Sequence, residues 1–329
     1  MTETNIDFVM IWVDGNDPAW RKEFDKYSFS EKGDKREIRF RDWNNLRYWF
    51  RGIEKFAPWV NKVHFATCGH YPEWLNLDAP KLNFVRHDEF IPSKYLPTFN
   101  ANTIELNIHR IEGLSENFVF FNDDIFLINK INSTRFFQKG IPCDIAVNNA
   151  IAGGGIGHLI LNDIETINRN FNKYAVIRSN FSKWFNLKYQ IYLLRTMLLL
   201  PWPRFTGFID PHLTNSYCKS TFKKVWEKEF DLLDKTCMSR FRESDNLNQY
   251  LMRYWQLMEG NFYPYNVMKK SEYIGITDET IDHIKYTIEK QENNIIDLND
   301  DGVSDFEYAQ RTINESFQKI LPDKSQFEI

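Results

Sequence analysis

Residues 118–129 read FVFFNDDIFLIN, an apolar run that is interrupted by Asn122, Asp123 and Asp124. Such a run is typical of a strand buried on both faces in a parallel sheet, and its end would present the paired carboxylates. Neighbouring carboxylates repel each other and lose hydration when they are partly buried, so the pair needs a compensating cation. Oxygen ligands favour Mg²⁺ or Mn²⁺, which commonly complete their coordination with substrate phosphate oxygens. The stretch therefore indicates metal-dependent chemistry on a phosphate.

The same three residues also have a simpler explanation. Asn and Asp are common where a strand turns into a loop, because their side chains hydrogen-bond to nearby backbone groups. Taken alone, the stretch leaves a metal site and an ordinary turn open.

The composition is that of a globular protein with a large core, since 43% of the 329 residues are hydrophobic and 16% are aromatic. A net charge of −4 argues against a nucleic-acid partner, which would require a basic surface. The four cysteines show no metal-binding spacing and fit reduced thiols. Neither a secretory signal nor an apolar run of about 20 residues is evident. We therefore expect a cytoplasmic protein.

Apolar runs and helical patterns alternate through the first half of the chain. Strands are predicted at residues 6–13, 63–67 and 82–87, and helices at 43–56 and 103–114. This alternation predicts an α/β fold with a Rossmann-like, mostly parallel sheet, in which ligands gather at the carboxyl ends of the strands. Asp14 and the Asp123–Asp124 pair both follow predicted strands, so both acidic loops should lie at that edge.

The second half is predicted to be mainly helical. The glycine-rich residues 152–157, AGGGIG, lack the spacing of a dinucleotide site and predict a loop. Residues 158–173 predict a strand followed by a helix, and helical patterns dominate after Thr221.

Residues 184–205, WFNLKYQIYLLRTMLLLPWPRF, combine aromatic and aliphatic residues with Lys188, Arg195 and Arg204, and contain no acidic residue. A cationic amphipathic segment of this kind can lie in the headgroup region of an anionic bilayer. It can equally pack as a helix inside the core. The sequence leaves peripheral contact with the inner membrane face and core packing both open.

Four blocks of the chain, taken in order, resemble the Stealth family of sugar-phosphate transferases. That family includes bacterial capsular polysaccharide phosphotransferases and the related lysosomal-enzyme N-acetylglucosamine-1-phosphotransferase of animals. The blocks are IDFVMIWVDGNDPAW (6–20), the long match from RFRDWNNLRYWF (39–50) to NDDIF (122–126), PHLTNSYCKSTFKKVW (211–226) with SRFRESDN (239–246), and IIDLNDD (295–301).

The resemblance implies a fold similar to GT-A nucleotide-sugar transferases. It implies transfer of a sugar-1-phosphate from a nucleotide-diphosphate sugar to a glycan hydroxyl, with release of a nucleoside monophosphate and formation of a cell-surface polysaccharide. The acceptor would be a lipid-linked or free glycan. Residues 1–140 would then form the nucleotide-sugar-binding core, 141–210 a variable insert, and 211–329 a helical part that completes the active site.

Within that reaction, the resemblance assigns Asp123, Asp124 and Asp300 to a Mg²⁺ or Mn²⁺ ion. Arg242 is assigned to the phosphate oxygens, because a guanidinium group can bind two of them at once. His212 is the predicted base for the acceptor hydroxyl, since an unperturbed histidine pKa of about 6.5 suits that task.

Further residues of the resembling blocks receive roles by position. Asp7 is predicted to act in catalysis together with Asp124, and the donor nucleotide sugar is predicted to be bound by Asp14, Arg47, Arg51 and Lys219. For Asp7 and Asp14 the spacing leaves open whether they face the nucleotide or order the metal site. Arg47 and Arg51 could instead pair with nearby carboxylates.

Two other functions compete with this one. A metal-dependent glycosyltransferase would use the same donor but release a nucleoside diphosphate. A catalytically silent glycan-binding protein would keep the fold without the reaction.

Overall fold

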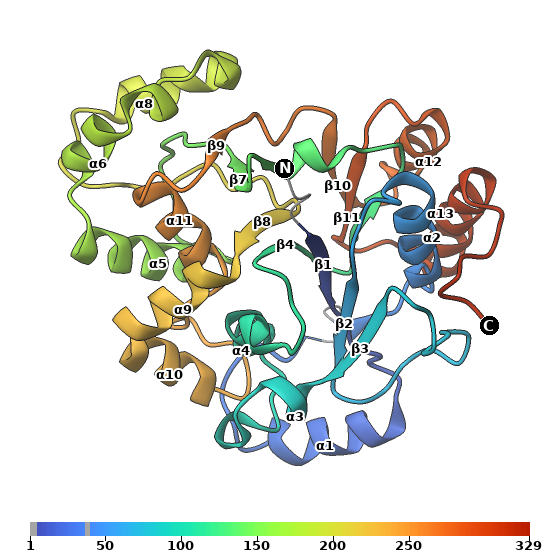
Figure 1. Ribbon diagram of the computed structural model, residues 1–329. Helices are drawn as coiled ribbons and strands as arrows, with labels where there is room; N and C mark the ends of the chain where they lie inside the picture. The colour runs from blue at the N-terminus through green and yellow to red at the C-terminus, as the bar shows by residue number, and fades with distance from the viewer. Residues whose placement is uncertain (1–4, 37–39) are drawn as a thin grey trace.

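A five-stranded sheet forms the centre of the molecule (Figure 1); the structure, a computed structural model, describes residues 5–36 and 40–329. The strand order is β3-β2-β1-β4-β8. Four strands are parallel: β1 (Ile6–Ile11), β2 (Val63–Thr67), β3 (Leu82–Arg86) and β4 (Asn117–Phe121). The fifth, β8 (Asn215–Cys218), runs antiparallel to β4. The prediction of an α/β fold with a mostly parallel sheet is confirmed.

Helices connect the parallel strands. They are α1 (Pro18–Ser28), α2 (Leu46–Phe56), α3 (His87–Phe90) and α4 (Ala101–Asn107), with short 3₁₀ turns at Ser93–Tyr95 and Ile108–Arg110. A further 3₁₀ turn, Ser133–Arg135, follows β4 in the chain. α1 begins where Asp17 accepts a hydrogen bond of 2.7 Å from the backbone N–H of Trp20, with Pro18 at the first helical position. The helix predicted at 43–56 is confirmed as the shorter α2. The helix predicted at 103–114 is confirmed in part, since α4 begins at Ala101, ends at Asn107 and is followed by the 3₁₀ turn Ile108–Arg110.

The second half is mainly helical, as predicted. Its helices are α5 (Gly157–Asn170), α6 (Lys173–Ser179), α7 (Phe181–Trp184), α8 (Leu193–Leu199), α9 (Lys219–Lys228), α10 (Phe230–Met238), α11 (Tyr250–Met258), α12 (Ile281–Lys290) and α13 (Phe306–Ile320), with a 3₁₀ segment at Leu187–Tyr192. Among the described residues, none of the helices is both long and apolar enough to cross a bilayer.

One prediction in this half is wrong. Residues 158–173 were expected to start as a strand, but α5 covers most of them. Ile160, Ile164 and Ile167 recur at helical spacing and are buried, whereas Leu161 is 37% exposed. The apolar cluster that indicated a strand is therefore one face of an amphipathic helix.

Two small sheets flank the central one. The first has the order β10-β11-β5 and consists of β10 (Ser271–Ile276), β11 (Ile295–Asp300) and β5 (Ile125–Leu127). The second consists of β6 (Phe137–Gln138), β7 (Ile141–Asp144) and β9 (Tyr263–Pro264). In the first sheet, β5 pairs antiparallel with β11, and Ile125 stands opposite Asp297. This pairing places the last block of the chain beside the Asp123–Asp124 turn.

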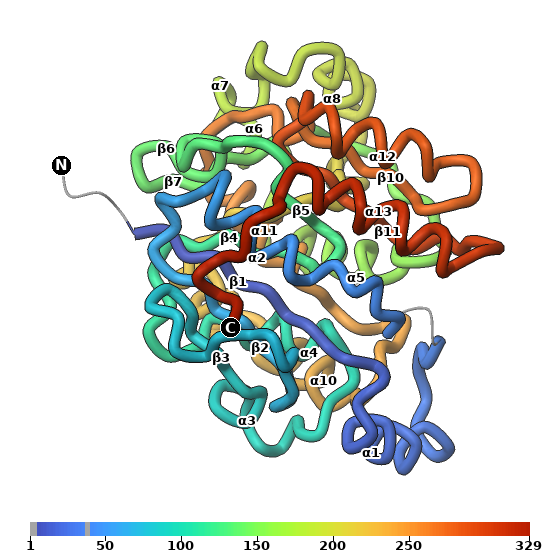
Figure 2. The backbone as a smooth tube through the Cα atoms, turned by 90° about the vertical axis from the view of Figure 1, so that its right-hand side faces the viewer, coloured from blue at the N-terminus to red at the C-terminus, as the bar shows by residue number. Residues whose placement is uncertain are grey.

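Side chains of the central strands alternate between two cores. Phe8 and Phe121 point into one core, with α2, α12 and α13, whereas Val9 and Phe120 point into the other, with α4, α5, α9 and α11. Figures 1 and 2 both show α2 and α13 side by side, and the rings of Tyr48 and Phe317 stack between them at 5.5 Å. The sheet is therefore covered on both faces, as a parallel sheet requires.

α2 approaches β5 very closely at Gly52. A Cβ atom at this position would lie 2.8 Å from the carbonyl oxygen of Leu127, which is closer than such atoms pack. Because β5 begins directly after Asp124, this contact fixes the strand that leads away from the acidic turn.

Both cores draw on distant parts of the chain. The core around Phe8 also contains Ile296 and Phe317, and the core around Val9 also contains Ile145 and Tyr254. The divisions expected at 1–140, 141–210 and 211–329 therefore mark stretches of chain that share their cores.

Two buried histidines make the fold sensitive to acid. Burial lowers the pKa of His87 and of His109 to about 3. In the unfolded chain both would titrate near 6.5. Below that pH the unfolded state binds protons that the folded state does not, so the free energy of unfolding falls by about 1.4 kcal/mol per pH unit for each histidine until about pH 3.

We therefore expect His109→Phe and His109→Gln to lose less stability than the wild type when the pH is lowered from 6.5 to 4.5. The slope should be shallower by about 1 kcal/mol per pH unit, as measured by urea unfolding at each pH. Both variants remove the titrating group, and they differ in polarity. Wild-type slopes in both would show that His109 is already protonated in the folded state.

Candidate active site

The carboxyl ends of the parallel strands open into a cavity of about 570 Å³. Trp12 and Cys68 line it after β1 and β2, and the Asn122–Asp124 turn lines it after β4. Its wall also includes the aromatic residues Trp20, Phe40, Trp43, Phe99 and Tyr250. A cavity of this size and position suits a ligand of the dimensions of a nucleotide sugar.

Asp124 occupies the tight turn between β4 and β5. Its backbone carbonyl accepts a hydrogen bond of 2.9 Å from the N–H of Leu298 on β11, and Ile125 N–H donates back to Asn122 at 3.3 Å. These bonds hold the turn against β11. Asp297, the neighbour of Leu298, is therefore brought to the same place, fully buried, and opposite Ile125.

His212 arrives from a third direction. Because β8 runs antiparallel to β4, the residues that precede β8 lie at the carboxyl end of β4. His212 is one of them, and it adopts the left-handed backbone conformation, with φ +47°. Its Nδ1 lies 2.7 Å from Asp297 Oδ2. This backbone conformation is strained for a non-glycine residue, and it occurs at the residue whose imidazole contacts the Asp297 carboxylate.

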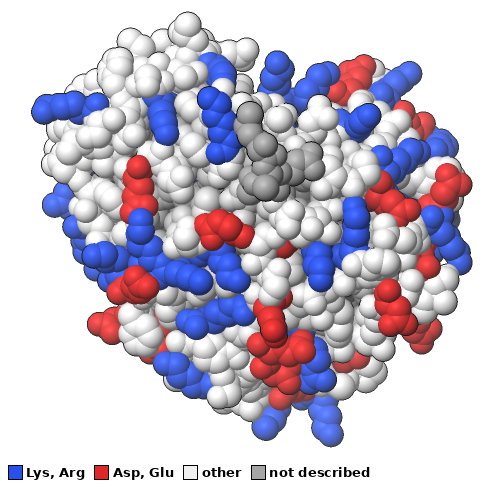
Figure 3. Space-filling view, viewed as in Figure 1, with Lys and Arg blue, Asp and Glu red and all other residues white. Residues whose placement is uncertain are grey.

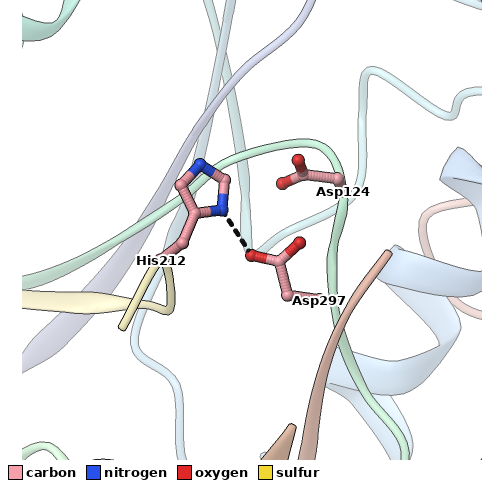
Figure 4. A group of neighbouring side chains, drawn as sticks. All are labelled: Asp124, His212 and Asp297. Atoms are coloured by element: carbon pink, nitrogen blue, oxygen red, sulfur yellow. Dashed lines mark hydrogen bonds and ion pairs between the residues drawn. The ribbon is translucent and has the colours of Figure 1, made fainter. Parts of the chain in front are cut away.

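Asp124, His212 and Asp297 form a group that could hold a metal ion (Figure 4). One ligand atom from each lies within 4.8 Å of the other two. The Oδ1 atoms of Asp124 and Asp297 are buried and accept no hydrogen bond from the described residues. Buried carboxylate oxygens without a donor are costly, and a cation would satisfy both. The residues therefore fit a divalent ion that accepts oxygen and imidazole ligands.

The pKa values of Asp124, His212 and Asp297 are shifted by burial and by their close approach. Burial and the charge of Asp297 raise the pKa of Asp124, and burial also raises the pKa of Asp297. Burial by itself lowers the pKa of His212, but the hydrogen bond and charge of Asp297 outweigh it and raise the pKa above its usual value. The ordinary histidine pKa on which the base assignment rested therefore does not apply while Asp297 is charged.

Three other predicted site residues line the same cavity: Asp123, Asp300 and Arg242. Asp300 accepts a hydrogen bond of 3.2 Å from Trp43 Nε1 and lies 3.4 Å from Arg41 Nη1, and it does not belong to the three-residue group. Within the described chain, the structure thus brings Asp297, and not Asp300, to Asp124 and His212. Arg242 reaches the cavity from a segment whose backbone pairs with Asp34.

Asp7 and Lys219 lie at the opposite end of the sheet. Asp7 is the second residue of β1, is fully buried, and accepts hydrogen bonds from Asn61 Nδ2 and Ser115 N, both at 2.7 Å. Burial raises the pKa of Asp7, but these bonds and one with His64 lower it overall. Lys219 donates to the carbonyl of Leu114 at 3.2 Å. The roles in catalysis and donor binding do not fit these places, because neither residue lines the cavity.

The remaining donor-binding candidates also stand outside the cavity lining. Arg51 forms a bidentate ion pair with Glu328, with both N–O distances 2.7 Å. The guanidinium of Arg47 lies over the ring of Trp74 at 5.6 Å. Asp14 accepts a hydrogen bond from Asn16 N at 2.8 Å, and its own N–H donates to His70 at 2.9 Å. Of the two roles predicted for Arg51, the structure has the pairing with a carboxylate, because the guanidinium binds Glu328 in the C-terminal segment.

The sequence analysis missed Asp297 and Glu105. Asp297 is the one carboxylate inside the apolar stretch IIDL, and a charged residue in a buried strand is itself a signal of pairing or metal binding. Glu105 lines the cavity from α4, where burial raises its pKa against the opposing charge of Arg242.

Comparisons with known proteins agree with the resemblance of the sequence blocks. The model of conserved region 2 of Stealth proteins matches residues 39–143. The capsular polysaccharide phosphotransferase WcwK of Streptococcus pneumoniae is 40% identical over 331 residues, which cover 98% of each chain. The exopolysaccharide phosphotransferase cps2G of Lactiplantibacillus plantarum is 40% identical, covering 98% of this chain and 96% of the relative. The receptor polysaccharide phosphotransferase WefC of Streptococcus gordonii is 39% identical, covering 98% and 99%.

A solved structure of the galactosyltransferase LgtC, in complex with donor and acceptor sugar analogs, aligns over 94% of this chain and 95% of that one, with 8% identity and a TM-score of 0.38. A likeness of that degree carries no argument about activity.

We expect Mn²⁺ to bind the isolated protein and Asp297→Asn to weaken its affinity at least about tenfold, since a charged ligand is lost. Affinity should also fall as the pH is lowered from 7 to 5, because protons compete for carboxylates whose pKa is raised. Titration followed by the electron paramagnetic resonance of free Mn²⁺ measures both effects. Asp300→Asn is the matched control and should keep the wild-type affinity. The reverse result, with Asp300→Asn weak and Asp297→Asn unchanged, would restore the assignment made from the sequence.

Arg51→Met should lower the free energy of unfolding by about 3 kcal/mol, because it leaves the buried carboxylate of Glu328 without its partner. Mn²⁺ affinity should not change. Chemical denaturation measures the first effect, and Arg51→Met combined with Glu328→Gln should recover part of the loss. A variant of normal stability with weakened donor binding would instead support the role predicted from the sequence.

Proposed function

Because the chain belongs to the Stealth family of capsular and exopolysaccharide phosphotransferases, we propose that it transfers a sugar-1-phosphate from a nucleotide-diphosphate sugar to a hydroxyl of a glycan. The products are a phosphodiester in a cell-surface polysaccharide and a nucleoside monophosphate. The acceptor in this proposal is a lipid-linked or free glycan that the protein meets in the cytoplasm.

One observation carries the proposal. Asp124, His212 and Arg242 line the cavity at the carboxyl ends of the strands, and the buried Asp297 groups with Asp124 and His212. These residues come from the β4–β5 turn, the segment before β8, β11 and the segment after α10, so the fold itself must be formed before they meet. Two carboxylates, an imidazole and a guanidinium are suited to the transfer of a phosphoryl group, because they can hold a cation, accept a proton and stabilise negative charge on phosphate oxygens.

The proposed step leaves the bond between the sugar and its phosphate intact. The oxygen of the acceptor hydroxyl attacks the phosphorus that carries the sugar, and a new P–O bond forms. The bond from that phosphorus to the bridging oxygen of the diphosphate breaks, and its electron pair leaves with the nucleoside monophosphate. The anomeric C–O bond is not broken, so its configuration is retained in the product.

Asp124 and Asp297 are proposed to hold a Mg²⁺ or Mn²⁺ ion, which supplies positive charge against the diphosphate oxygens when it is bound. Arg242 is proposed to bind the non-bridging oxygens, whose charge grows as the new bond forms. Asp123, exposed in the same turn, lines the cavity and is proposed to add a third carboxylate to its negative charge.

His212 is proposed to take the proton of the acceptor hydroxyl. Asp297 holds Nδ1, which orients the ring and leaves Nε2 as the nitrogen that can accept a proton. While Asp297 and Asp124 are charged, they raise the pKa of His212. A cation held by these carboxylates would offset their charge and favour the neutral imidazole that a base requires.

The released nucleotide tests this function. We expect incubation with UDP-, CDP- or GDP-linked sugars and Mn²⁺ to release the monophosphate of one nucleotide, slowly to water and faster with a glycan acceptor. Chromatography with mass detection distinguishes it from the diphosphate. Release of a nucleoside diphosphate would identify a glycosyltransferase, and release of neither from the whole panel would favour a glycan-binding protein.

Two variants make the test specific. Asp124→Asn should reduce release of the monophosphate by at least about 100-fold, since it removes charge from the reacting centre. Arg47→Gln should retain most of the activity, because Arg47 lies against Trp74 outside the cavity lining.

A further inference from the structure

An exposed apolar surface lies on the segment around α8. It consists of Leu187, Ile191, Leu194, Met197, Leu198 and Trp202, and we call it the α8 surface. These side chains are between 50% and 87% exposed. Of the nineteen large hydrophobic or aromatic side chains that are exposed in the described residues, seven fall within residues 181–202. The others are spread along the rest of the chain, so this concentration is a local property of the segment.

The spacing shows why three of these side chains share one face. Ile191, Leu194 and Leu198 follow one another at intervals of three and four residues, which is the repeat of a helical face. Leu187 lies before a bend at the non-helical Gln190, with φ +54°, so the repeat does not extend to it. Trp184, Tyr189, Thr196 and Phe205 of the same segment are buried, so one side of the segment packs in the core while the other side is exposed.

The buried side of the segment that carries the α8 surface is held by several hydrogen bonds. The Nζ of Lys173 donates to the carbonyls of Leu199 and Trp202 at 2.6 and 2.8 Å, and Thr196 Oγ1 accepts from Asn148 N at 3.1 Å. The hydroxyl of Tyr189 donates to the carbonyl of Lys183 at 2.9 Å. The segment is therefore an ordered element whose outer face is apolar, and its exposure does not come from loose packing.

The charge around this surface has one sign. Residues 166–209 contain seven Lys and Arg and no Asp or Glu, in a chain whose net charge is −4. Arg178, Lys188, Arg195 and Arg204 are exposed, and none of them pairs with a carboxylate of the described residues. Arg195 instead donates to the side-chain oxygen of Asn149 at 3.0 Å. Figure 3 shows the region over α8 as uncharged atoms with blue side chains around them and no red.

We propose that the α8 surface rests on a bilayer that contains anionic lipid. Apolar surface gains about 25 cal/mol per Å² when it leaves water, and patches of this kind are uncommon on proteins that have no partner. Trp202, between two prolines, is the residue type that sits at the boundary of a bilayer. The cations then meet the phosphates of the lipid headgroups. A second copy of the chain fits less well, because two cationic rims would face each other.

Flotation with vesicles tests this contact. We expect the full chain to float with vesicles of phosphatidylcholine and phosphatidylglycerol in equal parts, and much less with phosphatidylcholine alone. Replacing Lys188, Arg195 and Arg204 with Gln should lower the partition coefficient about fivefold for each charge. Leu194→Ser combined with Leu198→Ser should lower binding to both kinds of vesicle.

The matched control lies on α12, where Tyr286→Ser combined with Lys290→Gln also removes an exposed aromatic ring and a charge and should float like the wild type. All these side chains are exposed, so folding should persist, and circular dichroism verifies it. Equal flotation with and without phosphatidylglycerol, or wild-type flotation of the Leu194 and Leu198 variant, would overturn the proposal. Dimers in sedimentation that disappear in this variant, without lipid binding, would show that the surface joins two copies. The proposal does not depend on the transfer reaction.

Discussion

The contact between Asp297 and His212, with Asp124 beside it, is the constraint on which the rest of the structure depends. Two carboxylates and an imidazole are gathered where water is scarce, so each raises or lowers the proton affinity of the others. Such a group is stable only if the surrounding elements hold it in place. Three separate features do so: the β4–β5 turn, the backbone pairing of β5 with β11, and the reversed direction of β8.

Charged residues at the two ends of the central strands have different roles, one structural and one at the candidate site. At the amino ends of the strands, Asp7 is enclosed by amide and imidazole donors, and Lys219 is tied to a backbone carbonyl. At the carboxyl ends, the buried Oδ1 atoms of Asp124 and Asp297 lack donors in the described chain. Charged groups with satisfied partners stiffen a protein, whereas those without partners are ready for a ligand. The same residue type thus serves opposite purposes at the two edges.

Much of the first half could be predicted from the sequence because its signals are local. Alternating apolar runs predicted β1 to β4, the acidic residues after β4 predicted Asp124, and the family resemblance predicted His212. How these residues and Asp297 meet depends on contacts between residues far apart in the chain. No local pattern says that β8 runs antiparallel to β4, and this direction is what brings His212 to Asp124. Asp297 and Asp300 are equally acidic in the sequence, and only the register of β11 against β5 chooses between them.

Gly52 shows how far from the ligand the geometry of such a site can be decided. α2 lies so near to Leu127 that only a residue without a side chain fits at position 52. A bulkier residue there would push β5 away from α2 and so displace Asp124 relative to Asp297. A substitution at Gly52 would then lower activity although the residue contacts no substrate. A sequence comparison restricted to the cavity residues would not detect this effect.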